Sequence, residues 1–184
     1  MKKTFASIII IALVLVSCKK EQNPFLISKN AIGFLTDTTE VKDLELVFPN
    51  DSIATYEGNE TFNLPVNMVE IFDTNKNKLL ILTPREISDS TSTIGNVRIV
   101  DSRYKTEKGI STLSPFKDIQ KAYKISKIDN LINSVLISVN EINASFSIDK
   151  TELPANLRYD TSATIEAIQI PESAKIKFFF LYWD

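Results

Sequence analysis

The chain has 184 residues, a formal charge of −2 at pH 7, 43% hydrophobic residues and 24% charged residues. These values are ordinary for a globular protein, and they argue against a disordered chain and against non-specific nucleic-acid binding. Histidine is absent and cysteine occurs once, which excludes disulfide bonds within the chain, Ser-His and Cys-His catalytic pairs and histidine-ligated metals. We therefore expect a non-enzymatic protein with no cofactor or metal and no nucleic-acid partner.

The first 18 residues have the order of a secretory signal, in which two lysines precede an apolar run over 5–16. Twelve residues are too few to span a bilayer, which takes about 20 in a helix. The segment Leu15-Val16-Ser17-Cys18 resembles the lipobox of bacterial lipoproteins. The resemblance implies cleavage between Ser17 and Cys18, lipid on the Cys18 thiol and a place in the outer membrane. It leaves open whether the domain faces the periplasm or the cell surface.

The chain is accordingly expected to divide into a signal peptide (1–17), a lipidated tether (18–30) and one α+β domain (31–184). A strand is predicted at 31–35 and a helix over 38–48. Asp37 and Glu40 have capping-box spacing at the start of that helix, and apolar residues follow at helical intervals.

Strands are predicted next at 53–56, 66–72 and 78–83, the last two as an antiparallel hairpin. The loop over 86–93 consists largely of small polar residues, and we place there the boundary between two similar halves, 31–87 and 96–184.

A second helix is expected to begin with Ser114 as its cap and Pro115 at its first position. Further strands are predicted at 96–101, 134–140, 144–149, 164–170 and 174–183. The last of these is expected to be a central core strand with two buried faces, one of which contains Phe178, Phe180 and Tyr182. The predicted fold class is α+β, mostly antiparallel β-sheet with two short helices.

The two helical segments match each other when the sequence is shifted by 75 residues. The shift places Val41, Leu44 and Phe48 on Phe116, Ile119 and Tyr123. This predicts two similar helix-then-strands units, although any capped amphipathic helix before a strand gives a comparable match. The pattern, with Gly33 and Gly109 ahead of the helices, resembles the helix-plus-sheet modules of small envelope lipoproteins and of secreted β-lactamase inhibitors. That resemblance implies a fold and assigns no binding residue.

Charge is distributed unevenly, with nine acids against Lys42 alone over 37–73, and seven bases against two acids over 103–127. The seven bases are Arg103, Lys105, Lys108, Lys117, Lys121, Lys124 and Lys127. Lys117, Lys121 and Lys124 follow one another at intervals of four and three residues and are expected to share one exposed helix face. The seven bases predict a docking surface for an envelope protein with an acidic face or for anionic head groups, or simply a solvated helix face. The expected function is a non-catalytic binding or assembly module of the envelope. The alternatives are a carboxylate- or lysine-based hydrolase of envelope polymers, favoured by a deep cleft with converging Asp or Glu residues, and a carrier of an apolar ligand, favoured by a closed apolar cavity between sheet and helices.

Overall fold

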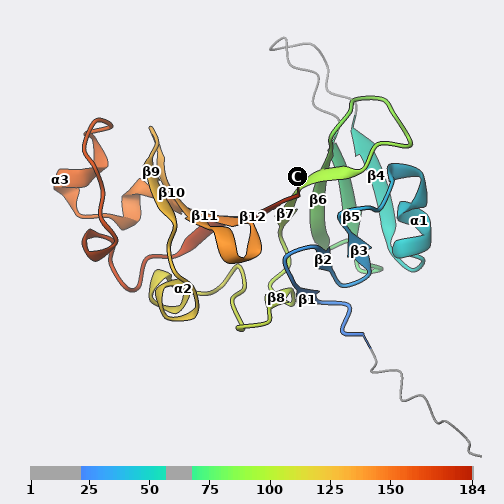
Figure 1. The fold of residues 1–184 in the computed structure, drawn as a ribbon, viewed down its shortest axis with the longest axis horizontal. Helices are drawn as coiled ribbons and strands as arrows, with labels where there is room; N and C mark the ends of the chain where they lie inside the picture. Colours follow the sequence, from blue (N-terminus) through green and yellow to red (C-terminus); the bar gives the residue numbers. More distant parts are fainter. Residues whose placement is uncertain (1–21, 57–67, 184) are drawn as a thin grey trace, which may run out of the picture.

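The computed structural model describes residues 22–56 and 68–183, so Ser17, Cys18 and the signal segment lie outside the described residues. Two sheets organise the chain (Figure 1). The larger has eight antiparallel strands in the order β4-β5-β6-β7-β12-β11-β10-β9. The smaller has the order β3-β2-β1-β8, in which β1 and β8 are parallel. The protein is therefore α+β and mostly sheet, as predicted.

The strands of the large sheet are β4 (Ser52–Tyr56), β5 (Met68–Phe72), β6 (Lys78–Pro84), β7 (Ile94–Ile99), β9 (Lys127–Asn130), β10 (Ser134–Val139), β11 (Ala144–Asp149) and β12 (Ile176–Tyr182). Those of the small sheet are β1 (Leu26–Ile27), β2 (Ala31–Ile32), β3 (Leu35–Thr36) and β8 (Lys105–Thr106). The helices are η1 (Val41–Asp43), α1 (Leu44–Val47), α2 (Phe116–Ala122), η2 (Asn140–Ile142), η3 (Lys150–Glu152), α3 (Ala155–Arg158) and η4 (Ala167–Gln169). Among the described residues no helix has the length and apolar character needed to cross a bilayer.

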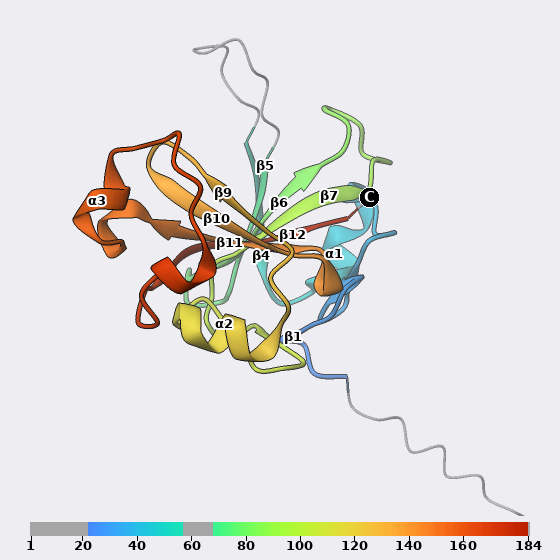
Figure 2. The same ribbon diagram turned by 60° about the vertical axis from the view of Figure 1, so that its left-hand side comes forward.

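The core lies between one face of the large sheet and a layer formed by α1, α2 and the small sheet (Figure 2). Leu44 of α1, Ile119 of α2 and Ile27 of β1 belong to the same buried cluster as the sheet residues. In the central strand β12, Phe179 and Leu181 are fully buried. The helices α1 and α2 and the small sheet are each too short to be stable alone, so burial against the large sheet holds them in place.

The large sheet consists of two four-stranded meanders, β4 to β7 and β9 to β12, and each meander follows a helix, α1 or α2. The two meanders meet where their last strands, β7 and β12, pair. Hydrogen bonds repeat with the predicted shift of 75 residues. The Thr36 amide donates to the Thr39 hydroxyl at 3.0 Å and the Ser111 amide to the Ser114 hydroxyl at 3.1 Å. Gly33 and Gly109, ahead of these turns, both have positive φ, 58° and 82°. The two helix-then-strands units are therefore confirmed. Their division falls between β7 and α2, because the loop over 86–93 joins neighbouring strands of one meander.

The first helix differs from its prediction over 38–48. Only η1 and α1, residues 41–47, are helical, and no side chain caps either of them. The predicted Asp37–Glu40 capping box is therefore wrong. The turn is held instead by the Thr39 hydroxyl, which accepts a hydrogen bond from the Thr36 amide. The strand expected at 31–35 is split into β2 and β3, because Gly33 turns the chain and passes so close to Pro24 that a Cβ there would lie 2.1 Å from the Pro24 carbonyl oxygen.

The strand predicted at 164–170 is also wrong. This segment contains η4, closed by a capping box between Glu166 and Gln169, and its apolar Ile168 is 88% exposed. Alternating apolar residues favoured a strand here, but the segment pairs with neither sheet. Conversely, β1 and its buried Ile27 lie ahead of residue 31, where the domain was expected to begin.

The last strand is central, as predicted, yet only one of its faces is fully buried. Phe179, Leu181 and Trp183 enter the core. Phe178, Phe180 and Tyr182 point to the opposite face of the sheet and are partly exposed, because no helix in the described parts of the chain covers that face (Figure 2). The expectation that this second face is also buried is therefore wrong.

Candidate binding cleft

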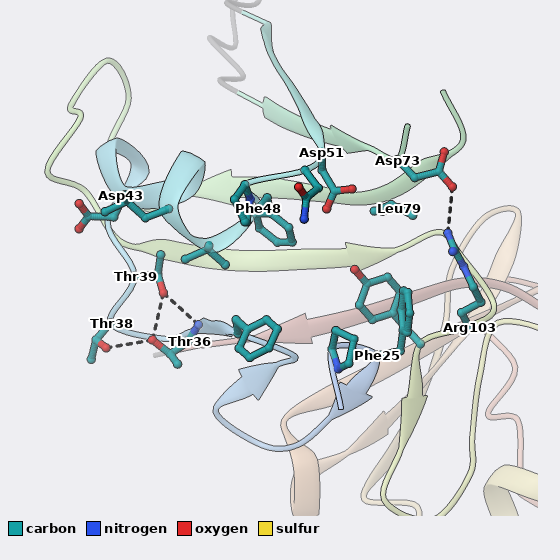
Figure 3. Close-up of a pocket in the computed structure, with 17 residues that line it drawn as sticks. Phe25, Thr36, Thr38, Thr39, Asp43, Phe48, Asp51, Asp73, Leu79 and Arg103 are labelled. Carbon is teal, nitrogen blue, oxygen red and sulfur yellow. Dashed lines mark hydrogen bonds and ion pairs between the residues drawn. The ribbon is translucent and has the colours of Figure 1, made fainter. Parts of the chain in front are cut away.

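An open cleft of about 810 Å³ lies between α1 with the turn after it and the N-terminal segment with the small sheet (Figure 3). Its size is within the range of small-molecule sites. Phe48 enters it because its amide closes the last turn of α1 on the Leu44 carbonyl at 2.9 Å and Pro49 cannot continue the helix. The cleft thus depends on a helix end and on a segment of chain far from it in sequence.

Apolar side chains form most of the cleft wall. Phe48, Leu79 and Tyr104 are buried at its base, whereas Phe34 and Leu46 are 54% and 80% exposed at its mouth. Such exposed apolar side chains, grouped around a concave surface, are typical of binding sites rather than of scattered surface residues.

The base of the cleft is held by aromatic contacts from the N-terminal segment. Phe25 meets Tyr104 edge to face, with ring centroids 5.1 Å apart and planes at 74°. The guanidinium carbon of Arg103 lies 4.8 Å from the centre of the Phe25 ring. Edge-to-face rings and a cation over a ring face are both attractive, since the ring face is negative and its edge positive. Phe25 is therefore part of the site, although it lies in the segment predicted to be a tether.

Polar groups gather at one end of the cleft. One terminal nitrogen of Arg103 lies 3.1 Å from an oxygen of Asp73 and 2.8 Å from one of Asp101. Asp73 also accepts hydrogen bonds from the amides of Asn75 and Asn77 and from the Asn77 side chain, at 2.9 to 3.1 Å. The hydrogen bonds from Asn77 are the largest cause that lowers the pKa of Asp73 below its ordinary value. Asp73 is thereby fixed as the residue that shapes the β5–β6 turn.

Asp51, beside Asp73, has a different environment. Its carboxylate has no hydrogen-bond or ion-pair partner among the described residues, and it lies at the edge of the apolar surface (Figure 3). Burial first, and then repulsion from Asp73, raises the pKa of Asp51. Asp51 is thus the one carboxylate at this end of the cleft that is open to a ligand.

The opposite end of the cleft has hydroxyl groups and one more acid. The Thr36 hydroxyl lies 3.1 Å from that of Thr38 and 3.0 Å from that of Thr39, and Asp43 projects nearby (Figure 3). In the described parts of the chain, no three Asp, Glu, Cys or His side chains are grouped as they would be around a metal ion. The arrangement is suited to binding an elongated molecule that is apolar along its length.

The seven basic residues singled out in the sequence do not form one face. The helix α2 ends at Ala122, because Tyr123 is extended with φ −136° and ψ 150°, so Lys124 and Lys127 lie beyond it and Lys127 begins β9. Arg103 lies in the cleft. The expectation that Lys117, Lys121 and Lys124 share one helix face is therefore wrong.

Most of these bases are also neutralised by acids, some of which are distant in sequence. Lys117 pairs with Glu172 at 2.5 Å, Lys108 with Glu141 at 2.6 Å and Lys127 with Asp129 at 2.7 Å. Within the described residues, Lys105, Lys121 and Lys124 are exposed and form no ion pair. The net positive surface is consequently smaller than composition suggested.

Fold and cleft together define an α+β protein of two helix-and-meander units with a partly apolar cleft in the first. Comparison with protein-family models and with curated proteins finds no match. Among solved structures, the chain is similar to the uncharacterized protein yfeY from Escherichia coli, with a TM-score of 0.57 and 14% identity over 85% of this chain and 98% of that one. This similarity shows the fold alone.

Proposed function

We propose that the protein is a lipoprotein of the bacterial outer membrane, anchored through Cys18, that binds an apolar ligand non-catalytically in the cleft. The observation that carries the binding function is the cleft of about 810 Å³, with Phe48, Leu79 and Tyr104 at its base and Phe34 and Leu46 at its mouth. Of the expected functions, the carrier of an apolar ligand has the most support from this geometry, although the cleft is open whereas a closed cavity was expected.

The position of the cleft in the chain supports the link to a membrane. Pro24 and Phe25 line the cleft and follow Cys18 by six and seven residues. Six residues reach at most about 20 Å when fully extended. A lipid on Cys18 would thus hold the cleft close to the bilayer surface, where apolar molecules are concentrated.

A carboxylate-based hydrolase is the less suitable alternative. It needs a second free carboxylate near Asp51 to act as base or nucleophile. The oxygens of Asp73 already accept three hydrogen bonds from Asn75 and Asn77 and one from Arg103, which fills the usual acceptor capacity of a carboxylate. Asp43 lies at the other end of the cleft (Figure 3).

Assembly through the basic residues is the other alternative, and it has a direct test. Lys121 and Lys124 form no ion pair in the described structure, although the charge of Lys121 contributes to lowering the pKa of Glu172. Pull-downs from intact envelopes with both residues changed to Glu would recover fewer proteins than the wild type if these residues dock a partner. We expect the same proteins from both.

The binding function is tested with the neutral apolar dye N-phenyl-1-naphthylamine and the full mature chain. Changing Phe34 to Ala and Leu46 to Gln together removes exposed apolar surface from the mouth of the cleft. The loss of roughly 1 kcal/mol or more of apolar contact should weaken dye binding about tenfold.

The matched control is the double change Leu113→Gln and Ile168→Gln, whose side chains are 79% and 88% exposed and do not line the cleft. It should leave dye binding unchanged. Absence of binding to the wild type, or equal losses in the two double variants, would show that the cleft is not the binding site. Cys18→Ser, compared with the wild type by palmitate labelling, tests the anchor separately.

A further inference from the structure

The cleft carries an imbalance of charge as well as an apolar surface. Its lining contains the carboxylates of Asp43, Asp51 and Asp73 and one base, Arg103. Arg103 bridges Asp73 and the neighbouring Asp101. Its charge also acts on Asp51, but burial and repulsion from Asp73 outweigh it, so the pKa of Asp51 is raised on balance. In the described chain, Asp43 and Asp51 form no ion pair, and the cleft is therefore negative at both ends.

Asp51 is the stronger attractant of the two for a cation. It lies where the polar end of the cleft meets the apolar base made by Phe48, Leu79 and Tyr104 (Figure 3). A partly desolvated carboxylate interacts more strongly with an opposite charge than one in bulk water does, because the local dielectric constant is lower. The field of Asp51 also contributes to raising the pKa of the Tyr104 hydroxyl, after burial, which shows that this charge is felt at the base of the cleft.

We infer that the ligand of the cleft is an amphiphile with a cationic head group, whose ammonium pairs with Asp51 while its apolar tail lies along Phe48 towards Phe34 and Leu46. This inference rests on the proposed binding function and adds the chemistry of the head group. The aromatic rings of Phe25 and Tyr104 at the same end add favourable contacts for an ammonium. An anionic head group is excluded from this end, because Asp51 and Asp73 would repel it.

The same geometry favours a small molecule over a protein segment. The volume of about 810 Å³ corresponds to a drug-sized ligand, and sites of this kind combine an apolar wall with a few polar groups that fix orientation. Asp51 is the orienting group here, since Asp73 and Arg103 are already occupied by each other.

The test uses three probes with the same eight-carbon tail, each below its micelle concentration: octylammonium, octyl glucoside and octyl sulfate. Isothermal titration calorimetry with the full mature chain should give the order ammonium, glucoside, sulfate, with a preference for ammonium over glucoside of about tenfold or more, as a charge-assisted hydrogen bond supplies. Asp51→Asn should abolish that preference and leave the affinity for octyl glucoside unchanged.

Asp43→Asn is the matched control, since it removes a carboxylate from the other end of the same cleft. It should retain most of the preference for octylammonium. Thermal unfolding of both variants verifies that they fold. Equal affinity for the three probes, or a loss of preference in Asp43→Asn but not in Asp51→Asn, would overturn the cationic head group. If the three probes bind equally and the Phe34 and Leu46 double variant loses them all, apolar binding stands and this inference fails. If none binds, both fail.

Discussion

Phe179 offers the sharpest test of the architecture, because it lies in the middle of the central strand β12. Its side chain is fully buried, its ring centroid lies 4.5 Å from that of Phe146, and its backbone is paired with Phe146 on one side and Ile99 on the other. Changing Phe179 to Ala removes buried apolar surface, leaves a cavity and breaks the ring pair. Changes of this kind cost about 3–5 kcal/mol, so we expect a loss of about 4 kcal/mol of unfolding free energy. That is a large part of the total stability of a typical domain, about 5–15 kcal/mol.

The neighbouring Phe178 is the control, since it projects from the opposite face of the same strand. It is partly exposed, and the guanidinium carbon of Arg98 lies 4.3 Å from the centre of its ring. Phe178→Ala should cost about 1 kcal/mol, mainly the contact with Arg98 and some burial.

Urea and thermal unfolding measure the two variants side by side. A change of 1 kcal/mol shifts Tm by roughly 2–4 °C in a chain of this size, so Tm should fall by about 8–16 °C for Phe179→Ala and by a few degrees for Phe178→Ala. A larger effect for Phe178→Ala would refute our assignment of the two faces of β12.

Three further predictions concern other parts of the molecule. Thr39→Ala and Ser114→Ala each remove the acceptor of an equivalent turn hydrogen bond, and each should lower the unfolding free energy by about 1 kcal/mol or more. Thr39→Ala should cost more, because the Thr39 hydroxyl also bonds that of Thr36; urea titrations that show no loss for either variant would argue against these turns. Lys150 is 4% exposed and its ammonium has no hydrogen-bond partner among the described residues, so Lys150→Met should raise the unfolding free energy by about 1 kcal/mol, and a loss of stability would contradict this. A hydrogen bond from Lys177 is the largest cause that lowers the pKa of Asp149. The ionised carboxylate therefore stabilises the fold fully at pH values above its ordinary pKa of about 4, and this contribution is lost as the pH falls through the lowered pKa. Carboxyl titration by NMR should show the Asp149 pKa rising in Lys177→Met, and an unchanged value would disprove the pairing.

Local patterns in the sequence were enough to predict much of the fold. The strands β4, β5, β6, β10 and β11 and the β5–β6 hairpin were all expected from alternating apolar residues and turn residues. The 75-residue repeat was visible because helix spacing and the hydroxyl residues ahead of each helix are local features, and the structure shows the same turn hydrogen bond at Thr39 and Ser114.

The candidate site was not predictable in the same way. Phe25, Phe48 and Tyr104 meet in one cleft, yet each is more than 20 residues from the next in the chain. Patterns within a single sequence do not predict contacts between segments so far apart. The one available signal was Phe25 itself, an aromatic residue directly after Pro24 in an otherwise polar stretch. The pairing of the basic residues was unpredictable for a related reason, since the acidic partners Glu141 and Glu172 are brought to Lys108 and Lys117 by the folded chain.

The sequence by itself determined the fold class, the repeat, the absence of histidine and the presence of a single cysteine, because these follow from composition and from spacings of a few residues. Tertiary structure decided where the first meander ends, which face of β12 is buried, and that Asp73 is saturated while Asp51 has no hydrogen-bond or ion-pair partner among the residues described. Those properties depend on distances between segments remote in the chain, and such distances are fixed only when apolar burial brings α1, the small sheet and the large sheet together.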